Sequence, residues 1–253
     1  MPRQLRALIH KTEGIVLRTL RHQENHLITT LYTEQYGIRS FIVKGYRSSR
    51  GRRRHSYFQP LSIIDIVYME RPNRDLQQLN ESQLAHLLQE VQTHPVKLSL
   101  GLALVEIFFD TVKEEHPNPA QYAFLRDIIL KLDAAPKRLI QLFLYFLVHH
   151  TRFLGFFPQD QSDDRAKVTF DYRQGILRPT GREGDPVALL LRRFLYAEPS
   201  LLPEPASCQQ ITFDNASKRH LIRTLFLYYQ EHIQGFRYPQ SMRIFAEVFG
   251  GEG

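Results

Sequence analysis

The spacing of apolar residues changes near residue 80, and this change limits the folds open to the chain. Before it, short runs rich in Val, Ile, Thr, Leu and Tyr are separated by turn residues, which is typical of strands. Strands are expected over Glu13–Leu20, His26–Thr33, Gly37–Tyr46 and Leu61–Met69, with a fifth near Leu76–Leu79. Five short strands in so short a stretch favour a small barrel of the OB-fold type.

After Asn80 the apolar residues recur at three- and four-residue spacing, which is the period of a helix. Helices are predicted over Glu81–Gln92, Pro95–Glu115, Ala120–Leu132, Pro136–Phe157, Pro186–Tyr196, Ala216–Gln234 and Ser241–Phe249. Strand-like runs at Val168–Tyr172 and Ile176–Leu177, joined by a turn at Gln174 and Gly175, predict a small β-hairpin. We therefore expect an α+β protein: a five-stranded OB-fold domain over residues 1–80 and an α-helical domain over residues 81–253, with an insertion near 159–180.

The excess positive charge lies in the predicted barrel. Residues 1–80 hold 14 Lys and Arg against 6 Asp and Glu, a net charge of +8, which leaves −1 for residues 81–253 out of the total of +7. A basic module joined to a neutral one suggests that the first part binds a polyanion and that the second acts as a scaffold or binds partners.

A run without apolar residues, Arg47–His55, separates the third and fourth predicted strands and must be a solvated loop. The candidate DNA-binding residues lie in it or beside it: Arg39, Lys44, Tyr46, Arg47, Arg50, Arg52, Arg53 and Arg54. Arginines neutralise phosphates, and aromatic rings stack on unpaired bases. The simpler alternative is a merely solvated loop, with the nearby rings of Tyr36, Phe41, Tyr57 and Phe58 serving as barrel core.

The sequence lacks the patterns of the common catalytic and metal centres. The carboxylates of residues 1–80 show no pairing suited to magnesium in a nuclease, and Asp160, Asp163 and Asp164 fall in a polar loop where we expect them to be solvated. His149 and His150 are adjacent on a predicted helix and do not share a face, so we expect one in the core and one at the surface. Without a P-loop, a Rossmann glycine motif or a nucleophile elbow, we expect no enzyme, no metal and no cofactor.

Neither the N-terminal segment nor the most apolar segment of the chain suggests a membrane protein. The N-terminus lacks the apolar run of a signal peptide, and the most apolar segment, Leu139–Val148, is too short to span a bilayer. The single cysteine, Cys208, allows no intramolecular disulfide and fits a reducing compartment. We expect a cytoplasmic protein without membrane contact.

Several segments, in order, resemble the RecO family of recombination mediators. Thr12–Leu17 is similar to the opening strand of the family, and Gln23–Leu31 to its Gly-Glu-x-Asp segment before a Thr-Leu strand. Tyr36-Gly37 and Lys44–Arg47 match its turn and its Lys-Gly-x-Arg segment, and Phe153–Pro158 its Leu-Gly-aromatic-x-Pro segment. The resemblance is strongest over residues 12–47 and thin after residue 180.

The resemblance implies an OB-fold followed by helices and a role in recombinational repair. It implies binding to single- and double-stranded DNA and annealing of complementary single strands. It also implies help to RecA, together with RecR, in displacing single-strand-binding protein. The basic segment that includes Lys44 and Arg47 would contact DNA, and the helical domain would bind the acidic C-terminal tail of single-strand-binding protein. For that tail we single out a basic, aromatic-lined groove that involves either the fourth predicted helix, Pro136–Phe157, or the face that carries Arg126 and Lys131.

The chain departs from many relatives after Pro158, where they carry zinc-binding cysteine pairs. Here Gln159–Arg165 holds no cysteine, so we expect no zinc and a subdomain held by packing. A non-catalytic mediator is the leading hypothesis. An RNA- or ribosome-associated OB-fold protein fits the composition equally well, because stacking and phosphate contacts do not distinguish DNA from RNA. A nuclease is the third hypothesis, against which the unpaired carboxylates argue.

Overall fold

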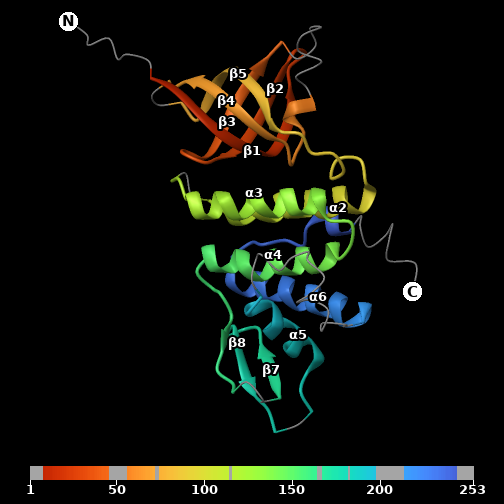
Figure 1. Cartoon of the computed structure of the whole chain (residues 1–253). Helices are drawn as coiled ribbons and strands as arrows, with labels where there is room; N and C mark the ends of the chain where they lie inside the picture. The colour runs from red at the N-terminus through yellow and green to blue at the C-terminus, as the bar shows by residue number, and fades with distance from the viewer. Residues whose placement is uncertain are drawn as a thin grey trace, which may run out of the picture. The chain divides into compact units, whose positions relative to one another are not determined.

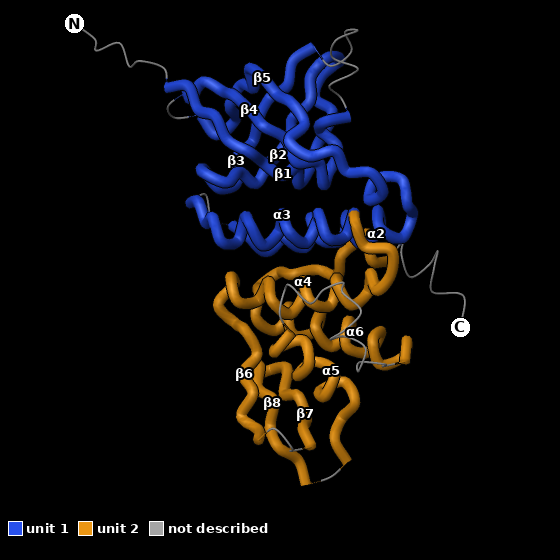
Figure 2. Tube along the Cα trace, in the orientation of Figure 1, with its two compact units in different colours: residues 1–133 blue, residues 134–253 orange. Residues whose placement is uncertain are grey.

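The computed structural model describes residues 8–45, 56–71, 74–113, 116–163, 167–181, 183–197 and 214–243. The chain divides into two compact units, Met1–Asp133 and Ala134–Gly253, drawn in different colours in Figure 2. Each unit has its own core. Strands predominate in the first unit and helices in the second, which confirms the α+β class predicted from the sequence.

The first unit begins with a closed five-stranded barrel (Figure 1). Its strands are β1 (Ile9–His22), β2 (His26–Thr33), β3 (Gly37–Lys44), β4 (Ile63–Met69) and β5 (Leu76–His86). The order around the barrel is β1-β2-β3-β5-β4, and every pair is antiparallel except β3 with β5. The predicted OB-fold barrel is confirmed.

Strand β1 is long because it belongs to both sides of the barrel. Its first half, Ile9–Ile15, pairs with β4, and its second half, Gly14–His22, pairs with β2. A bulge between Val16 and Arg18 bends the strand where it passes from one partner to the other. The interior is filled by Val16, Leu27, Leu31, Phe41, Phe58, Ile64, Ile66 and Tyr68, all buried.

The helix predicted over Glu81–Gln92 is wrong, because β5 continues through this stretch to His86. Its leucines fit a helical spacing, but Leu87 is 75 % exposed and Leu84 is 36 % exposed, so they form no buried stripe. Pairing with the whole of β4, helped by two register shifts, fixes the backbone as a strand instead. The predicted domain boundary at residue 80 therefore falls inside β5.

Two helices, α2 (Pro95–Thr111) and α3 (Pro119–Ala134), complete the first unit and lie along the barrel in Figure 1. Tyr32 of β2 anchors them. Its ring centroid lies 4.7 Å from that of Phe108 and 5.8 Å from that of Tyr122, and its hydroxyl donates to Gln121 Oε1 at 3.0 Å. Aromatic packing and one buried hydrogen bond thus join the barrel to both helices.

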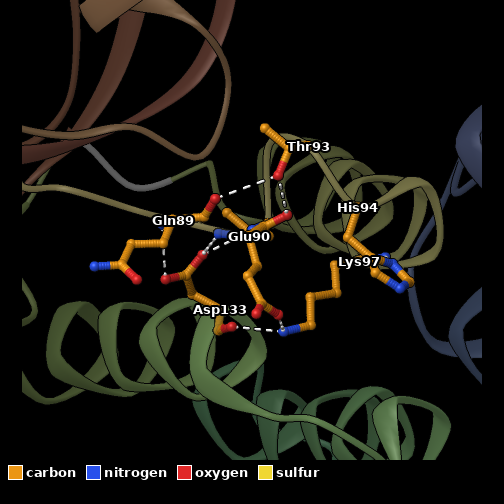
Figure 3. Close-up of polar contacts among 7 residues, drawn as sticks. Gln89, Glu90, Thr93, His94, Lys97 and Asp133 are labelled. Carbon is orange, nitrogen blue, oxygen red and sulfur yellow. Dashed lines mark hydrogen bonds and ion pairs between the residues drawn. The ribbon is translucent and has the colours of Figure 1, made fainter.

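The end of α3 holds the connection between β5 and α2 (Figure 3). The carboxylate of Asp133 accepts hydrogen bonds from the backbone N–H groups of Gln89, Glu90 and Val91, at 3.0, 2.8 and 2.7 Å. Its backbone carbonyl accepts from Nζ of Lys97 at 2.6 Å, and the same ammonium pairs with Glu90. Lys97 is 2 % exposed, and these partners satisfy the buried charge.

The second unit contains α4 (Leu139–Phe153), α5 (Pro186–Leu195) and α6 (Asn215–His232), with a three-stranded sheet of order β6-β8-β7. The sheet consists of β6 (Gln159–Asp160), β7 (Val168–Asp171) and β8 (Ile176–Pro179), so the predicted hairpin is confirmed. Gly175 in its turn has φ +70° and touches Tyr228, so a side chain there would be both strained and crowded. Asp214 caps α6 as predicted, accepting from Ser217 N at 2.7 Å. The helix predicted over Ser241–Phe249 lies mostly outside the described residues.

Both histidines of α4 are buried, which corrects the prediction that one lies at the surface. Nε2 of His149 donates to the Phe194 carbonyl at 2.8 Å, and the His150 ring stacks on Phe146 with centroids 5.0 Å apart. Burial lowers the pKa of His149 to about 4. The hydrogen bond to Phe194 raises the pKa and the nearby Arg152 lowers it, and both effects are smaller than that of burial. Burial alone lowers the pKa of His150 to about 3. The central helix of this unit has apolar neighbours on nearly every side, so even adjacent positions are inside.

The side chain of Asp160 is buried, although the sequence predicted a solvated one. Its carboxylate accepts from Nε of Arg192 at 2.7 Å, and its side chain is 3 % exposed. This buried ion pair joins β6 to α5 within the second unit.

Replacing Asp133 by Ala is expected to lower the free energy of unfolding by about 1–3 kcal/mol, because three backbone N–H groups and their loop lose one shared acceptor. Chemical denaturation of the whole chain measures the change. Asp127→Ala is the matched control on the same helix, since Asp127 makes only a partly exposed pair with Lys131 and its loss should cost less than about 0.5 kcal/mol. Equal effects of the two changes would contradict the role given to Asp133.

The buried histidines predict that the second unit loses stability in mild acid. An unfolded histidine has a pKa near 6.5, so between that value and the folded pKa the unfolded chain binds the extra proton. The stabilisation is complete above about pH 6.5 and is lost as the pH falls. Each histidine should cost about 2 kcal/mol between pH 6.5 and pH 5.

His150→Phe keeps a ring against Phe146 and should reduce by about 2 kcal/mol the difference in unfolding free energy between pH 7 and pH 5. Urea denaturation at the two pH values measures it. His220→Gln, an exposed change on α6, should leave the difference as it is in the unaltered chain. If the His150→Phe variant and the unaltered chain lose the same unfolding free energy between pH 7 and pH 5, protonation of His150 is not the cause of the loss.

Candidate nucleic-acid interface

Two of the predicted DNA-binding residues lie on β3. Lys44 ends the strand, is exposed, and donates from Nζ to Gln78 Oε1 of β5 at 3.2 Å. Arg39 lies near the other end of the strand, half-buried. The remaining predicted residues, Tyr46, Arg47, Arg50, Arg52, Arg53 and Arg54, lie outside the described residues.

Arg39 opens onto a pocket of about 410 Å³ in the first unit. We call it the arginine pocket. It is lined by β3, by the connection from β4 to β5, and by the end of α2, through Ile38, Arg39, Ser40, Tyr68, Glu70, Arg71, Arg74, Asp75, Gln77, Phe109, Val112 and Lys113. Four cations face two carboxylates, so the lining has a net positive charge. The arrangement suits an anion that also carries an apolar or aromatic part.

The sequence prediction missed Arg71, Arg74 and Lys113. A signal was present, because Arg71 and Arg74 form a second basic cluster between two predicted strands. Only the closed barrel brings that cluster beside Arg39, and only the packing of α2 adds Lys113 to them. The distance along the chain from Arg39 to Lys113 hides this grouping in the sequence.

An aromatic group adjoins the pocket. The His10 ring stacks on Tyr68 with centroids 5.1 Å apart, its Nδ1 lies 2.8 Å from the Tyr36 hydroxyl, and its Nε2 donates to Glu70 at 2.8 Å. Burial raises the pKa of Tyr68 to about 12, helped by Tyr36 and Glu70 and opposed by Arg39. Tyr68 therefore stays a neutral phenol and adds no negative charge beside a bound anion.

The other rings considered as stacking platforms divide into two groups. Phe41 and Phe58 are buried inside the barrel, so the core role applies to them. Tyr36 and Tyr57 are half-buried at its surface.

The two residues singled out for a protein partner have intramolecular partners. Nε of Arg126 pairs with Glu13 Oε1 at 2.8 Å, and the same oxygen accepts from the Tyr122 hydroxyl at 2.9 Å. Burial and the nearby Glu13 raise the Tyr122 pKa well above its usual value. Lys131 pairs with Asp127 one turn away at 2.9 Å. Arg126 thus helps to join α3 to β1.

The region that follows Pro158 does not fit a zinc ion. It offers no thiolate, and the carboxylate of Asp160 is taken by Arg192 and by the hydroxyl of Ser162, which lies 2.5 Å away. Within the described ranges, no three His, Cys, Asp or Glu side chains gather closely enough to hold a metal ion. No helix among the described residues is long and apolar enough to cross a membrane.

A closed five-stranded barrel with clustered basic residues defines an OB-fold protein of the nucleic-acid-binding class. Residues 7–88 match the family described as Recombination protein O N terminal, and residues 92–242 match Recombination protein O C terminal. The chain therefore belongs to the RecO family of DNA repair proteins.

Individual relatives match along nearly the whole chain. The DNA repair protein RecO of Christiangramia forsetii is 32 % identical over 249 residues, covering 96 % of this chain and 100 % of the relative. The same-named proteins of Flavobacterium psychrophilum and Phocaeicola vulgatus are 25 % and 27 % identical, covering 94 % and 96 % of this chain and 98 % and 100 % of the relatives.

Because Arg126 is held by Glu13, Arg126→Ala should lower the free energy of unfolding by about 1–3 kcal/mol, leaving a half-buried carboxylate with one donor fewer. Lys131→Ala on the same helix should change it by less than about 0.5 kcal/mol. Denaturation curves compare the two variants. An Arg126→Ala chain of unchanged stability would show that this side chain is not needed to join α3 to β1.

Proposed function

We propose that this chain is a recombination mediator that binds single- and double-stranded DNA, anneals complementary strands, and assists RecA in loading onto DNA coated with single-strand-binding protein. The observation that carries the proposal is membership of the RecO family along nearly the whole chain. No catalytic step is part of it.

Annealing requires two polyanions to approach each other. Residues 1–80, which make up most of the barrel, carry a net charge of +8 that would neutralise phosphates on both strands and release the counterions condensed on them. The barrel offers Arg39 and Lys44 on β3. The sequence adds arginines over residues 47–54, which lie outside the described residues. Strands held side by side in this way can search for complementary bases, and their annealing weakens steeply with salt.

We assign partner docking to the helical part of the chain. Its proposed partners are RecR and the acidic C-terminal tail of single-strand-binding protein, with RecA affected indirectly. The face of α3 with Arg126 and Lys131 is the proposed contact for the tail, although both side chains already have partners within the first unit. The proposed place of action is the cytoplasm, at the nucleoid during repair.

The function is tested by annealing of complementary strands, naked and coated with single-strand-binding protein. Wild-type chain should anneal both rapidly, and the triple change Arg52→Ala, Arg53→Ala and Arg54→Ala should slow annealing at least about tenfold, because three phosphate contacts are lost. A control chain with Arg173, Arg219 and Arg223 changed to Ala removes the same charge from exposed positions of the second unit and should anneal normally.

Each contrary result has a definite meaning. Failure of the wild-type chain to anneal would overturn the mediator function, and tighter binding of RNA than of matched DNA would favour an RNA-binding role. Normal annealing by the triple variant would keep the function and remove the loop from it. Magnesium-dependent cleavage of the strands would restore the nuclease hypothesis.

A further inference from the structure

The arginine pocket has the size and composition of a ligand site. Its volume of about 410 Å³ lies in the range of small-molecule sites, roughly 300–1,000 Å³. Cations stand at its rim, while Ile38, Tyr68, Phe109 and Val112 supply apolar and aromatic surface. Charge beside an aromatic floor is the combination that recognises a phosphate joined to a base.

The two arginines of the β4–β5 connection are positioned by a buried amide. Gln77 is 6 % exposed, and its Oε1 accepts from the backbone N–H of Arg71 at 2.8 Å. Its Nε2 donates to the carbonyls of Arg71 and Arg74, at 3.1 and 2.5 Å. One side chain therefore holds the backbone at both arginines before an anion binds, so the ordering that remains is that of the two exposed arginine side chains.

The two carboxylates of the lining, Glu70 and Asp75, are outnumbered by its four cations, so its net charge still attracts an anion. Glu70 accepts a hydrogen bond from His10 at 2.8 Å, which directs its carboxylate to that ring. A further cation, Arg18 of β1, lies 5.9 Å from the centroid of the Phe109 ring. Phe109 itself is half-buried, so part of its ring is accessible from the pocket.

The strand edge at the pocket is too short for a peptide. β3 pairs with β5 only over Ser40–Ile42, so the edge of β3 that faces the pocket before Ser40 is limited to Gly37–Arg39. A peptide that extends a sheet needs several residues of free edge. A compact ligand fits this opening better than an extended acidic peptide.

From these contacts we propose that the arginine pocket binds one nucleotide unit of single-stranded DNA, with its phosphate against Arg39, Arg71 and Arg74 and its base against Phe109. The proposal rests on DNA binding by the barrel, as proposed above. It adds a defined subsite to a surface that would otherwise act only through diffuse charge. A base withdrawn from stacking with its neighbours is also held in a single-stranded state.

The charge part of the proposal is tested with Arg71→Ala combined with Arg74→Ala. Binding of an oligothymidine is measured by fluorescence anisotropy over a series of salt concentrations. Loss of two phosphate contacts should lower the slope of log K against log salt by about 1.4. The control, Arg173→Ala with Arg219→Ala, removes the same charge from the second unit and should leave the slope unchanged.

The stacking part is tested with Phe109→Leu, which keeps an apolar side chain but removes the ring. Affinity should fall at least about fivefold with the salt slope unchanged, since no phosphate contact is touched. An oligonucleotide that carries 5-iodouracil should cross-link to the ring of Phe109 in the wild-type chain, and peptide mapping locates the bond.

The role of Gln77 in positioning Arg71 and Arg74 is tested with a change that removes no charge. Gln77→Ala removes no charge but releases the backbone at Arg71 and Arg74, so it should weaken binding severalfold. Gln83→Ala, on the same strand, loses only an exposed bond to Asp65 and should bind like wild type. Circular dichroism of each variant shows whether the barrel still folds.

The outcomes distinguish binding of a nucleotide in the arginine pocket from the proposed DNA-binding function of the whole chain. If the wild-type chain binds no DNA, both fail. The subsite alone is overturned if the wild-type chain binds DNA but the Arg71/Arg74, Phe109 and Gln77 variants all keep the wild-type affinity and salt slope, and the 5-iodouracil cross-link in the wild-type chain falls on residues outside the pocket. If those variants lose binding of an acidic peptide and keep binding of DNA, the pocket belongs to a protein partner and the proposal is wrong.

Discussion

The short parallel pairing of β3 with β5 closes the barrel, and most of the first unit depends on it. Three residues of each strand meet in this ladder, yet it converts an open sheet into one without exposed edges. Because β5 begins at Leu76, opposite Ser40, the first residues of β3 have no partner in β5, and the arginine pocket lies beside them. The interaction that completes the fold therefore also borders the arginine pocket.

The helices are joined to the barrel by a few polar contacts set in an apolar interface. Glu13 on β1 receives Arg126 and Tyr122 of α3, while Tyr32 on β2 packs between rings of both helices. Asp133 then holds the segment that links the last strand to α2. The result is that the barrel and two helices form one compact unit, although the residue pattern suggested that the helices belong to a separate domain.

The sequence predicted the first four strands to within a few residues, because each has β-branched residues bounded by turns. It failed at residues 81–92, where Leu84, Leu87 and Leu88 satisfy a helical period while pairing with β4 holds the backbone as a strand as far as His86. It failed at Asp160 and at the one histidine of the pair His149 and His150 that was expected at the surface, because burial depends on neighbours far away in the chain. The arginine pocket combines side chains from three segments, and no local pattern could bring Arg39, Arg74 and Lys113 together.

The loop that carries Arg71 and Arg74 is positioned by an uncharged group. The bonds made by Gln77 are neutral amide bonds in a buried setting, and such bonds are not screened by ions in the solvent. Ionic strength would therefore act on the attraction between protein and phosphate without altering the shape of the receptor. If the proposed subsite binds DNA, a rise in salt concentration would release the strand and a fall would let it bind again, while the hydrogen bonds of Gln77 to Arg71 and Arg74 stay in place.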